Sequence, residues 1–529
     1  MTAVYELGYF AVKWCEVDSV YSDLQTAVQR RVLRVETAIW AAVKCSFAST
    51  LANGMLVSMT HRSTRLIRTI AVYVAIGLLT LVAAAIALGG LATSGIAVAK
   101  YAVGGAIISV FVALGLKRME YFVLLVLFIR PSLDILKSGS ADSAAAPGSL
   151  LAVLFVVVSA FWLIAQRRAG AQRHPDSMVQ RSLLVFGAAA TLSLVDTANV
   201  RSTAADLIRT IAIVMMFFVV ERILEHTRRP ELFVGAILAS AVAPLIIGFA
   251  GSYVGLTVTE TKDGVSRVHS TFGLANPYAY YLVSVGIILV AIAAATAGRP
   301  RSLALAGAAI TGVALLTTQV RGAWIAFAVG LIAIGFLAGR KILLGVLLVM
   351  AMTWVAVPDI ASQFSNVSTT SAGNAVAEDS LTWRVRHWQA ILPLANANPV
   401  TGVGLNTVAE LAPDGTNKLA HNDYLRAYVE LGVLGLGAFL CMLATMLMTS
   451  WRAWLSATVP TTRAVSLASF GVLLGLVVGG LSDNLMSSIV EMWPVSAIVA
   501  CAGWALRHPS GLTSFVSPSD YTPSIRMES

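Results

Sequence analysis

Apolar residues form long, nearly unbroken runs along most of the chain, and short polar connections separate these runs. A helix needs about 20 apolar residues to cross the hydrocarbon core of a bilayer, and fewer when it is short or buried in protein. Most runs show no amphipathic periodicity, as expected for helices surrounded by lipid or by other helices. The pattern predicts 12 to 14 membrane spans, because the third run is short and the last begins late. The runs lie near 66–88, 101–116, 119–130, 149–165, 181–195, 206–220, 232–250, 276–297, 303–318, 321–338, 341–357, 428–449, 465–481 and 493–506.

The composition indicates a single polytopic membrane domain. Of the 529 residues, 57% are hydrophobic and only 12% are charged, and the mean hydropathy is +0.79. These values exclude a disordered chain and an ordinary soluble protein, in which roughly a quarter of the residues are charged. The net charge of +10 is also found in nucleic-acid-binding proteins, but here the positive residues lie between apolar runs, so no nucleic-acid partner is expected. We predict an all-α, polytopic transmembrane helical bundle with one long, partly helical loop on its outer side.

The positive residues also predict the orientation of the bundle. If the first run begins in the cytoplasm, every short connection on that side carries at least two Lys or Arg residues. Cytoplasmic loops of membrane proteins are enriched in these residues. Both termini are therefore predicted to be cytoplasmic, with an even number of spans.

The ends of the chain differ from the predicted bundle, which covers 66–357 and 428–506. Residues 1–65 contain no secretory signal and are expected to be a cytoplasmic segment. Within them, 24–48 has the pattern of an amphipathic helix on the inner membrane surface. The alternatives are a poorly ordered leader or a start codon assigned too early. Residues 507–529 are rich in Ser and Pro and predict a disordered cytoplasmic tail.

Two outer segments, 251–275 and 358–427, are too long and too polar to be simple connections. Long loops in compact domains are usually functional or disordered. Aromatic and cationic residues at helical spacing over 381–392 predict an ordered helix at the membrane interface. The Asn-Pro and Gly-x-Gly sequences within 398–407 predict turns.

Three outer elements each offer a cation or a titratable group, namely Arg267, Arg321 and His421. An arginine at the end of a span is costly unless it reaches the interface or meets an anionic partner. A lone loop histidine is more often solvated than catalytic, so the residues alone leave the convergence of these three groups open. Asp483-Asn484 in the last outer turn is a candidate sugar contact. The four cysteines have no metal-ligand spacing and no Asp-x-Asp motif occurs, so no metal site is predicted.

Four short motifs resemble those of the O-antigen ligase and polymerase superfamily. They are TFGLANPYAYYL at 271–282, TQVRGAWIAF at 318–327 with Val320 where the family usually has Ser, WRVRHWQAILPLANANPVTGVGLNT at 383–407, and AHNDYLRAYVELGVLGL at 420–436. Each motif is weak alone. Together they occur in the family's order, cover about 267–436, and fall on the side that the charge pattern independently predicts to be outside.

The resemblance implies a multi-spanning glycosyltransferase of the bacterial inner membrane. Enzymes of this family take a polysaccharide from an undecaprenyl-pyrophosphate carrier on the periplasmic face. They transfer it to a hydroxyl of lipid A–core, in the ligases, or of another repeat unit, in the polymerases. The family's loop histidine maps to His421, and its two outer arginines map to Arg321 and, with variable spacing, to Arg267. The substrate-binding residues expected from the resemblance are Arg384, Arg386, Asn422, Tyr424, Trp388 and Asn276.

The expected chemistry needs neither a metal nor a cofactor. The bond to be broken joins an anomeric carbon to pyrophosphate, which gains negative charge as it departs. Guanidinium groups bind phosphate in a bidentate manner, so two arginines suit this leaving group. A neutral His421, whose imidazole has a reference pKa of about 6.5, can remove the proton of the acceptor hydroxyl. Direct attack would invert the anomeric centre.

The sequence leaves several side-chain roles open. Asn422 or Asp423 can orient His421 or cap the following helix, and capping is favoured for Asp423. Glu430 can bind sugar or pair with Arg426 one turn earlier, and pairing is favoured. For Trp383 and Trp388, stacking on sugar competes with anchoring at the membrane interface, and anchoring is the more common use of Trp.

Other functions are also compatible with the pattern. A ligase is favoured slightly over a repeat-unit polymerase, which shares the same motifs. A lipid-linked sugar transporter or flippase is less favoured, because no internal repeat is evident and the charges gather at one face. A membrane scaffold has no specific feature in its support.

Overall fold

The structure is a computed structural model, and it describes residues 111–136, 147–168, 177–262, 265–356, 380–415 and 418–510. The chain divides into two compact units, Met1–Ile67 and Arg68–Ser529, and every described residue belongs to the second. The amphipathic helix expected at 24–48, the run near 66–88 and most of the run near 101–116 lie outside the described residues. So do 358–379 of the long outer loop and the tail beyond 510.

The described part is almost entirely helical, which confirms the predicted all-α class. Each apolar run predicted within it forms a helix, and its only sheet is a two-stranded antiparallel hairpin. The elements are α4 (Met119–Ile129), η1 (Arg130–Leu136), α5 (Pro147–Arg168), α6 (Met178–Leu192), α7 (Val200–Thr227), α8 (Pro230–Ser240), α9 (Val242–Ala250), η2 (Gly251–Val254), β1 (Thr259–Lys262), β2 (Val265–Val268), α10 (Ala275–Ala295), α11 (Gly298–Thr317), α12 (Arg321–Ala338), α13 (Arg340–Ala356), α15 (Ser380–Ala397), α16 (Val408–Leu411), α17 (Asp423–Ser456), α18 (Pro460–Gly479) and α19 (Ile489–Arg507).

Among the described residues, 8 helical segments are long and apolar enough to cross a membrane. They are α5, the continuous stretch α8–α9–η2, α10, α11, α12, α17, α18 and α19. α6 is apolar but has only 15 residues, and α7 has 28 residues but several charged side chains. The molecule is thus a multi-pass helical membrane protein, and the predicted total of 12 to 14 spans includes runs beyond the described part.

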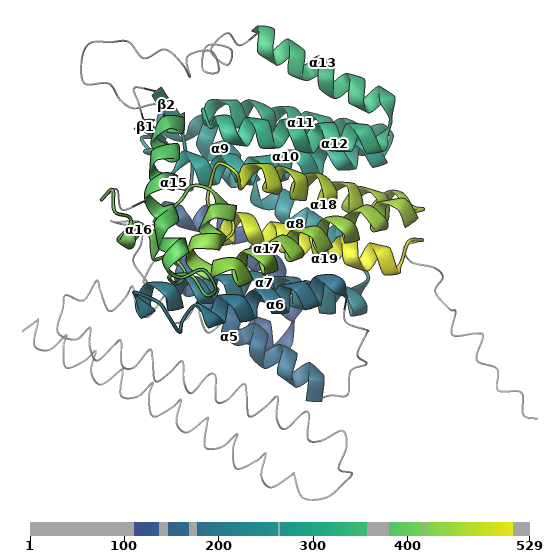
Figure 1. Cartoon of the computed structure of the whole chain (residues 1–529). Coiled ribbons are helices and arrows are strands. Elements are labelled where there is room, and N and C mark those ends of the chain that lie inside the picture. The colour runs from purple at the N-terminus through teal and green to yellow at the C-terminus, as the bar shows by residue number, and fades with distance from the viewer. Residues whose placement is uncertain are drawn as a thin grey trace, which may run out of the picture. The chain divides into compact units, whose positions relative to one another are not determined.

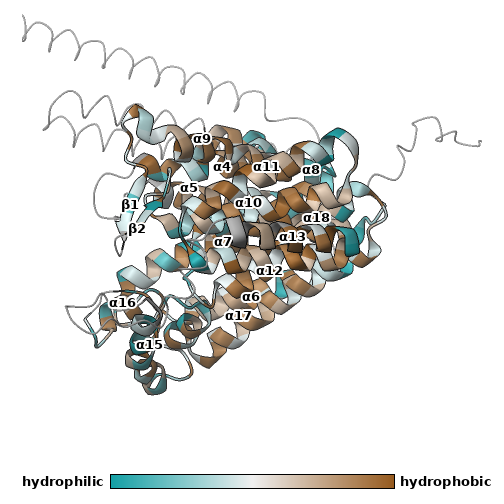
Figure 2. Ribbon diagram, turned by 90° about the horizontal axis from the view of Figure 1, so that it is seen from above, coloured by the Kyte–Doolittle hydropathy of each residue, from teal (hydrophilic) through white to brown (hydrophobic). Residues whose placement is uncertain are grey.

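Central and peripheral helices differ in what surrounds them. In the apolar segment of α19, 94% of the residues are buried, against 22% in α11. Large apolar side chains of the peripheral helices are exposed, as at Phe336 of α12 and Leu303 of α11. Between central helices, small hydroxyl groups pair: the Oγ atoms of Ser450 and Ser469 are 2.7 Å apart, as is common where membrane helices pack closely. Figure 2 shows the apolar residues distributed along the lengths of the spans.

The hairpin β1–β2 and the helices α15 and α16 gather at one end of the bundle, which we call the loop end (Figure 1). α15 contains the interfacial helix predicted over 381–392, which is therefore confirmed as a helix. The turn 480–488 between α18 and α19 reaches the same end, because the N–H of Asp423, the first residue of α17, donates to the carbonyl of Gly480 at 2.7 Å. Segments far apart in the chain therefore meet at the loop end.

Helix α17 is broken at Gly432, where φ is 66° and ψ is −168°. A break inside a membrane helix leaves backbone groups that must find partners within the protein. The predicted turn segment 398–407 supplies them. Two of its N–H groups donate to the carbonyls of Val429 and Glu430, each at 3.0 Å. The turn segment thus completes the hydrogen bonding of the broken helix.

Two glycines allow the turn segment and the break to approach each other. A Cβ atom at Gly402 would lie 2.3 Å from the carbonyl carbon of Glu430, and one at Gly432 would lie 2.2 Å from the carbonyl oxygen of Val400. Both glycines also have φ in the left-handed region, where a side chain is strained. The contact between the two backbones therefore excludes any larger residue at either position.

A buried ion network joins α17 to α7. The guanidinium of Arg426 is fully buried, with Nη2 2.8 Å from Asp206 Oδ2 and Nε 2.9 Å from Glu430 Oε2. Asp206 also pairs with Arg209 at 3.2 Å. The predicted pairing of Glu430 with Arg426 is confirmed. Because removing one partner leaves a buried charge uncompensated, the network holds the first segment of α17 firmly against α7.

Gly402→Ala should destabilise the protein, because the added methyl group would overlap the backbone of Glu430. We expect a loss of about 2 kcal/mol or more in the free energy of unfolding, measured as a lower thermal unfolding temperature in detergent. Gly437→Ala on α17 is the matched control, since a Cβ there meets no atom within 4 Å. Equal unfolding temperatures for the two variants would contradict the proposed role of the close approach.

Candidate active site at the loop end

His421 immediately precedes the cap of α17. Its backbone has φ of 48°, an uncommon left-handed conformation for a residue other than glycine. The side chain of the next residue, Asn422, caps the helix: its Oδ1 accepts the N–H groups of Tyr424 and Leu425, each at 3.0 Å. This cap fixes the direction in which the chain enters α17, and with it the position of His421.

The expected division of roles between the two residues after His421 is wrong. Asp423 was favoured as the cap of its own helix, but Asn422 takes that role. The carboxylate of Asp423 instead accepts the N–H groups of Leu485 and Met486 in the turn 480–488, at 3.1 Å. The reason is geometric, because only the tertiary fold brings that turn, some sixty residues later in the chain, next to α17.

The carboxylate that orients His421 is Asp483. Its Oδ1 lies 3.2 Å from His421 Nδ1, and its Oδ2 accepts a hydrogen bond from Asn276 Nδ2 at 2.6 Å. The imidazole of His421 is partly exposed, whereas Asp483 is 8% exposed. The sequence suggested Asp483 only as a sugar contact. It also suggested Asn276 as a substrate-binding residue, but in the structure the amide of Asn276 supports Asp483.

The surroundings of Asp483 favour its ionised form. Burial alone would raise the pKa of this carboxyl, but the hydrogen bond and the charge of His421 lower it, helped by the N–H of Asn484 and the nearby guanidinium of Arg384. The net result is a pKa below the ordinary value for Asp. Because an ionised carboxylate can only accept, the proton of a neutral His421 ring is on Nδ1 and the lone pair is on Nε2.

Arg321, the first residue of α12, belongs to a hairpin that packs on the turn carrying Asp483. A Cβ atom on the adjacent Gly322 would lie 2.4 Å from Ser482 Oγ and 2.8 Å from the hydroxyl of Tyr280. Ser482 immediately precedes Asp483 in that turn. Gly322, the residue after Arg321, therefore packs against Ser482, the residue before Asp483.

Arg267 lies on strand β2, opposite Glu260 of β1 in the hairpin register. Glu260 Oε1 accepts the N–H of Ala275 at 3.1 Å, and Ala275 precedes the Asn276 that binds Asp483. The hairpin is therefore joined to the first turn of α10, and through it to the turn 480–488. The elements that carry Arg321 and His421 thus contact this turn directly, and the hairpin of Arg267 is linked to it through the first turn of α10.

Helix α15 contacts His421 through Trp383. The two rings meet edge to face, with centroids 5.8 Å apart and planes at 73°. Lys418 Nζ lies 4.5 Å from the centroid of the same indole, and the imidazole of His387 stacks on it at 5.1 Å. The sequence suggested Trp383 only for sugar stacking or anchoring. In the structure, its contact restricts the tilt of the His421 ring, and the contact of Nδ1 with Asp483 restricts the rotation of that ring.

The two arginines predicted on α15 have different environments. Arg384 is close enough to Asp483 to lower the pKa of that carboxyl. Arg386 is exposed and lines a hollow of about 400 Å³ with Thr382, Val385 and Gln389. Two residues along a helix lie roughly 200° apart around its axis, so the two guanidinium groups belong to different faces of α15.

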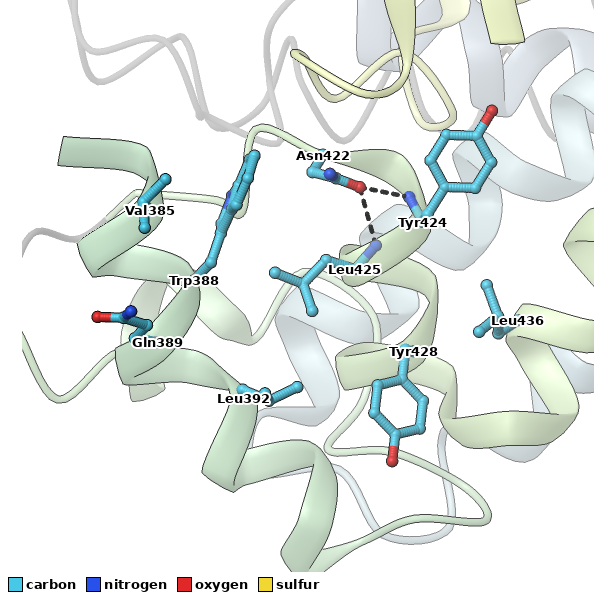
Figure 3. A pocket seen from close by; sticks show the side chains of 9 residues that line it. All are labelled: Val385, Trp388, Gln389, Leu392, Asn422, Tyr424, Leu425, Tyr428 and Leu436. Carbon is cyan, nitrogen blue, oxygen red and sulfur yellow. Dashed lines mark hydrogen bonds between the residues drawn. The ribbon is translucent and has the colours of Figure 1, made fainter. Parts of the chain in front are cut away.

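Trp388, Asn422 and Tyr424 line an apolar groove between α15 and α17 (Figure 3). The polar atoms of two of them already have protein partners: Trp388 Nε1 donates to the carbonyl of Ala420 at 2.6 Å, and the hydroxyl of Tyr424 donates to that of Val477 at 2.7 Å. The structure thus brings these three expected substrate-binding residues together beside His421.

No three His, Cys, Asp or Glu side chains gather with the geometry of a metal site in the described part of the chain. The absence of a metal requirement stays a prediction.

Asp483→Asn should destabilise the protein at neutral pH, because the ionised carboxylate holds His421 and Asn276. A carboxyl whose folded-state pKa is lowered contributes stability above its unfolded-state pKa of about 3.9, and that contribution is lost as the pH falls through the folded-state value. The unfolding temperatures of the wild type and of Asp483→Asn should therefore differ, and the difference should persist from about pH 7 to about pH 4. A difference that already shrinks between about pH 7 and about pH 5 would contradict the lowered pKa.

Comparison with known proteins agrees with the motifs. Residues 306–440 match the family model described as O-antigen ligase, and this segment runs from α11 into α17. It includes Arg321 and His421, whereas Arg267 and Asp483 lie outside it. A search of curated proteins gives no match to the chain. The resemblance seen in the sequence is confirmed over this segment: the protein is a multi-pass membrane protein whose residues 306–440 are similar to the O-antigen ligase family.

Proposed function

We propose that the protein is an inner-membrane glycosyltransferase of the O-antigen ligase type. It transfers a polysaccharide from an undecaprenyl-pyrophosphate carrier to an acceptor hydroxyl, such as that of a lipid A–core sugar, on the periplasmic face. The observation that carries the proposal is the pairing of His421 Nδ1 with Asp483 at 3.2 Å. A histidine oriented by a buried carboxylate is the arrangement that general bases use.

In the proposed reaction, His421 Nε2 takes the proton of the acceptor hydroxyl. The freed oxygen attacks the anomeric carbon of the donor glycan, and the bond from that carbon to the pyrophosphate oxygen breaks with its electron pair. The products are the extended glycan and undecaprenyl pyrophosphate. Attack from the side opposite the leaving group inverts the anomeric centre. Asp483, held by Asn276 at 2.6 Å, stabilises the imidazolium that forms.

The leaving pyrophosphate needs positive charge on the other side of the anomeric carbon. Arg321 and Arg267 are proposed to supply it, because the hairpin of Arg321 packs on the turn 480–488 and the hairpin of Arg267 is linked to that turn through the first turn of α10. Arg384, whose charge acts on Asp483, is a third candidate. Guanidinium groups held in place by packing stabilise developing phosphate charge without a metal ion. We therefore propose metal-independent catalysis.

His421→Ala and Arg321→Ala should each reduce glycan transfer by a factor of about 10² to 10⁴, the usual contribution of a positioned general base or of a donor to the developing charge. The assay is transfer by the purified protein from a lipid-linked glycan, with insertion and unfolding temperature checked in parallel. His226→Ala and Arg340→Ala, which replace exposed residues of the same types elsewhere, are the controls. Full activity in both site variants would refute the mechanism.

A chelator added to the same purified assay should leave the rate unchanged. Activity that is lost with chelator and returns with Mg²⁺ would contradict metal independence.

Deletion of the gene, followed by gel analysis of surface polysaccharide, distinguishes a ligase from a polymerase. Loss of a ligase should leave long chains unattached, whereas loss of a polymerase should leave single repeat units.

A further inference from the structure

A second histidine of the loop end, His387 on α15, also pairs with a carboxylate. Its side chain is fully buried, and its Nδ1 lies 2.6 Å from Oδ2 of Asp414, in the turn after α16. Burying an imidazole costs free energy, which the hydrogen bond to Asp414 offsets, whereas an apolar side chain would fill the same space without that cost. Packing alone therefore does not explain a histidine at this position.

A separate apolar core packs the loop end together. Its buried members are Ile391, Ala395, Val403, Val408, Ala412, Ala420 and Val429, which come from α15, the turn segment 398–407, α16, the segment before His421, and α17. Trp388 packs against this core, and its Nε1 donates to the carbonyl of Ala420, the residue before His421, at 2.6 Å. The backbone that leads into His421 is thus held to α15 by contacts other than those of His387.

The His387–Asp414 pair acts on Trp383 instead. Residues four apart lie on one face of a helix, and the imidazole of His387 stacks on the indole of Trp383, with centroids 5.1 Å apart and planes at 13°. The same indole meets the imidazole of His421 at 5.8 Å. A row of contacts therefore runs from Asp414 through His387 and Trp383 to His421.

This row supplies a restraint that Asp483 alone does not give. A single contact at Nδ1 leaves the imidazole of His421 able to swing about that atom. A general base must be held within hydrogen-bond reach of the proton that it removes. Trp383 opposes the swing only while the indole is itself held, and the stacked imidazole of His387, fixed by Asp414, holds it.

We propose that His387 and Asp414 are positioning residues for the general base: by holding Trp383, they keep the imidazole of His421 in its productive orientation. The expected effect on transfer rests on the proposed function, whereas the expected effect on the mobility of the His421 ring does not.

The first test measures transfer. His387→Asn removes the stacking ring and should lower kcat about tenfold to a hundredfold, as expected for a small misplacement of a reacting group, with the KM values of donor and acceptor changed little. Asp414→Ala changes an exposed residue and should have the same effect. Asp414→Asn, whose amide oxygen can still accept from His387, should keep most of the activity. Wild-type kcat in both His387→Asn and Asp414→Ala overturns the proposal.

Helix α19 offers a matched control. His508 stacks on Trp504, again four residues earlier, with centroids 4.9 Å apart and planes at 20°. This stack lies at the C-terminal end of a helix of 19 residues whose other end adjoins the turn 480–488. His508→Asn removes the same kind of stack far from His421 and should leave kcat unchanged. A loss of kcat equal to that in His387→Asn overturns the proposal.

The second test does not depend on transfer. Diethyl pyrocarbonate is added to the full-length protein, and carbethoxylation of His421, whose side chain is 28% exposed, is followed by peptide mass spectrometry. His387→Asn and Asp414→Ala should raise this rate several-fold, because a ring that Trp383 no longer restrains becomes more accessible, whereas His508→Asn should not. An unchanged rate in both loop-end variants overturns the proposal, even where transfer falls. A raised rate in a protein that transfers no glycan would refute the proposed function and leave the positioning role standing.

Discussion

The candidate site depends on the break in α17 at Gly432. Breaking a helix in a membrane protein frees carbonyl and N–H groups that lipid cannot satisfy. The turn segment 398–407 satisfies the carbonyls of Val429 and Glu430, and two glycines permit the approach. The nine residues before the break are then a separate short helix, locked to α7 by the buried guanidinium of Arg426. His421 stands at the start of this short, doubly anchored segment.

The turn 480–488 organises the remaining parts of the site. This turn makes two kinds of contact with the start of α17. Its backbone N–H groups donate to the carboxylate of Asp423, and the carboxylate of Asp483 within the turn pairs with His421. Asn276 and Gly322 bring α10 and α12 to the same turn. The position of the imidazole and that of the hairpin of Arg321 therefore both depend on this turn.

The polar and the apolar parts of the loop end are separated along α17. Beside His421 lies the carboxylate of Asp483, on which the charge of Arg384 from α15 also acts. Along α17 beyond Asn422, by contrast, polar atoms such as the hydroxyl of Tyr424 are already bonded to backbone. Under the proposed function, the acid–base chemistry is confined to the first part, and Asn422 marks the boundary between the two.

The sequence by itself determined the helical bundle, the ordered α15 and the Arg426–Glu430 pair, because hydrophobic runs and i, i+4 spacing are local properties of the chain. It also marked His421 through a local motif. It did not reveal that Asp483 rather than a neighbour of His421 orients the imidazole, nor that Asn422 rather than Asp423 caps α17. Those choices were decided by the tertiary structure, since they depend on which distant turn packs against the helix end, and sequence distance carries no record of that contact.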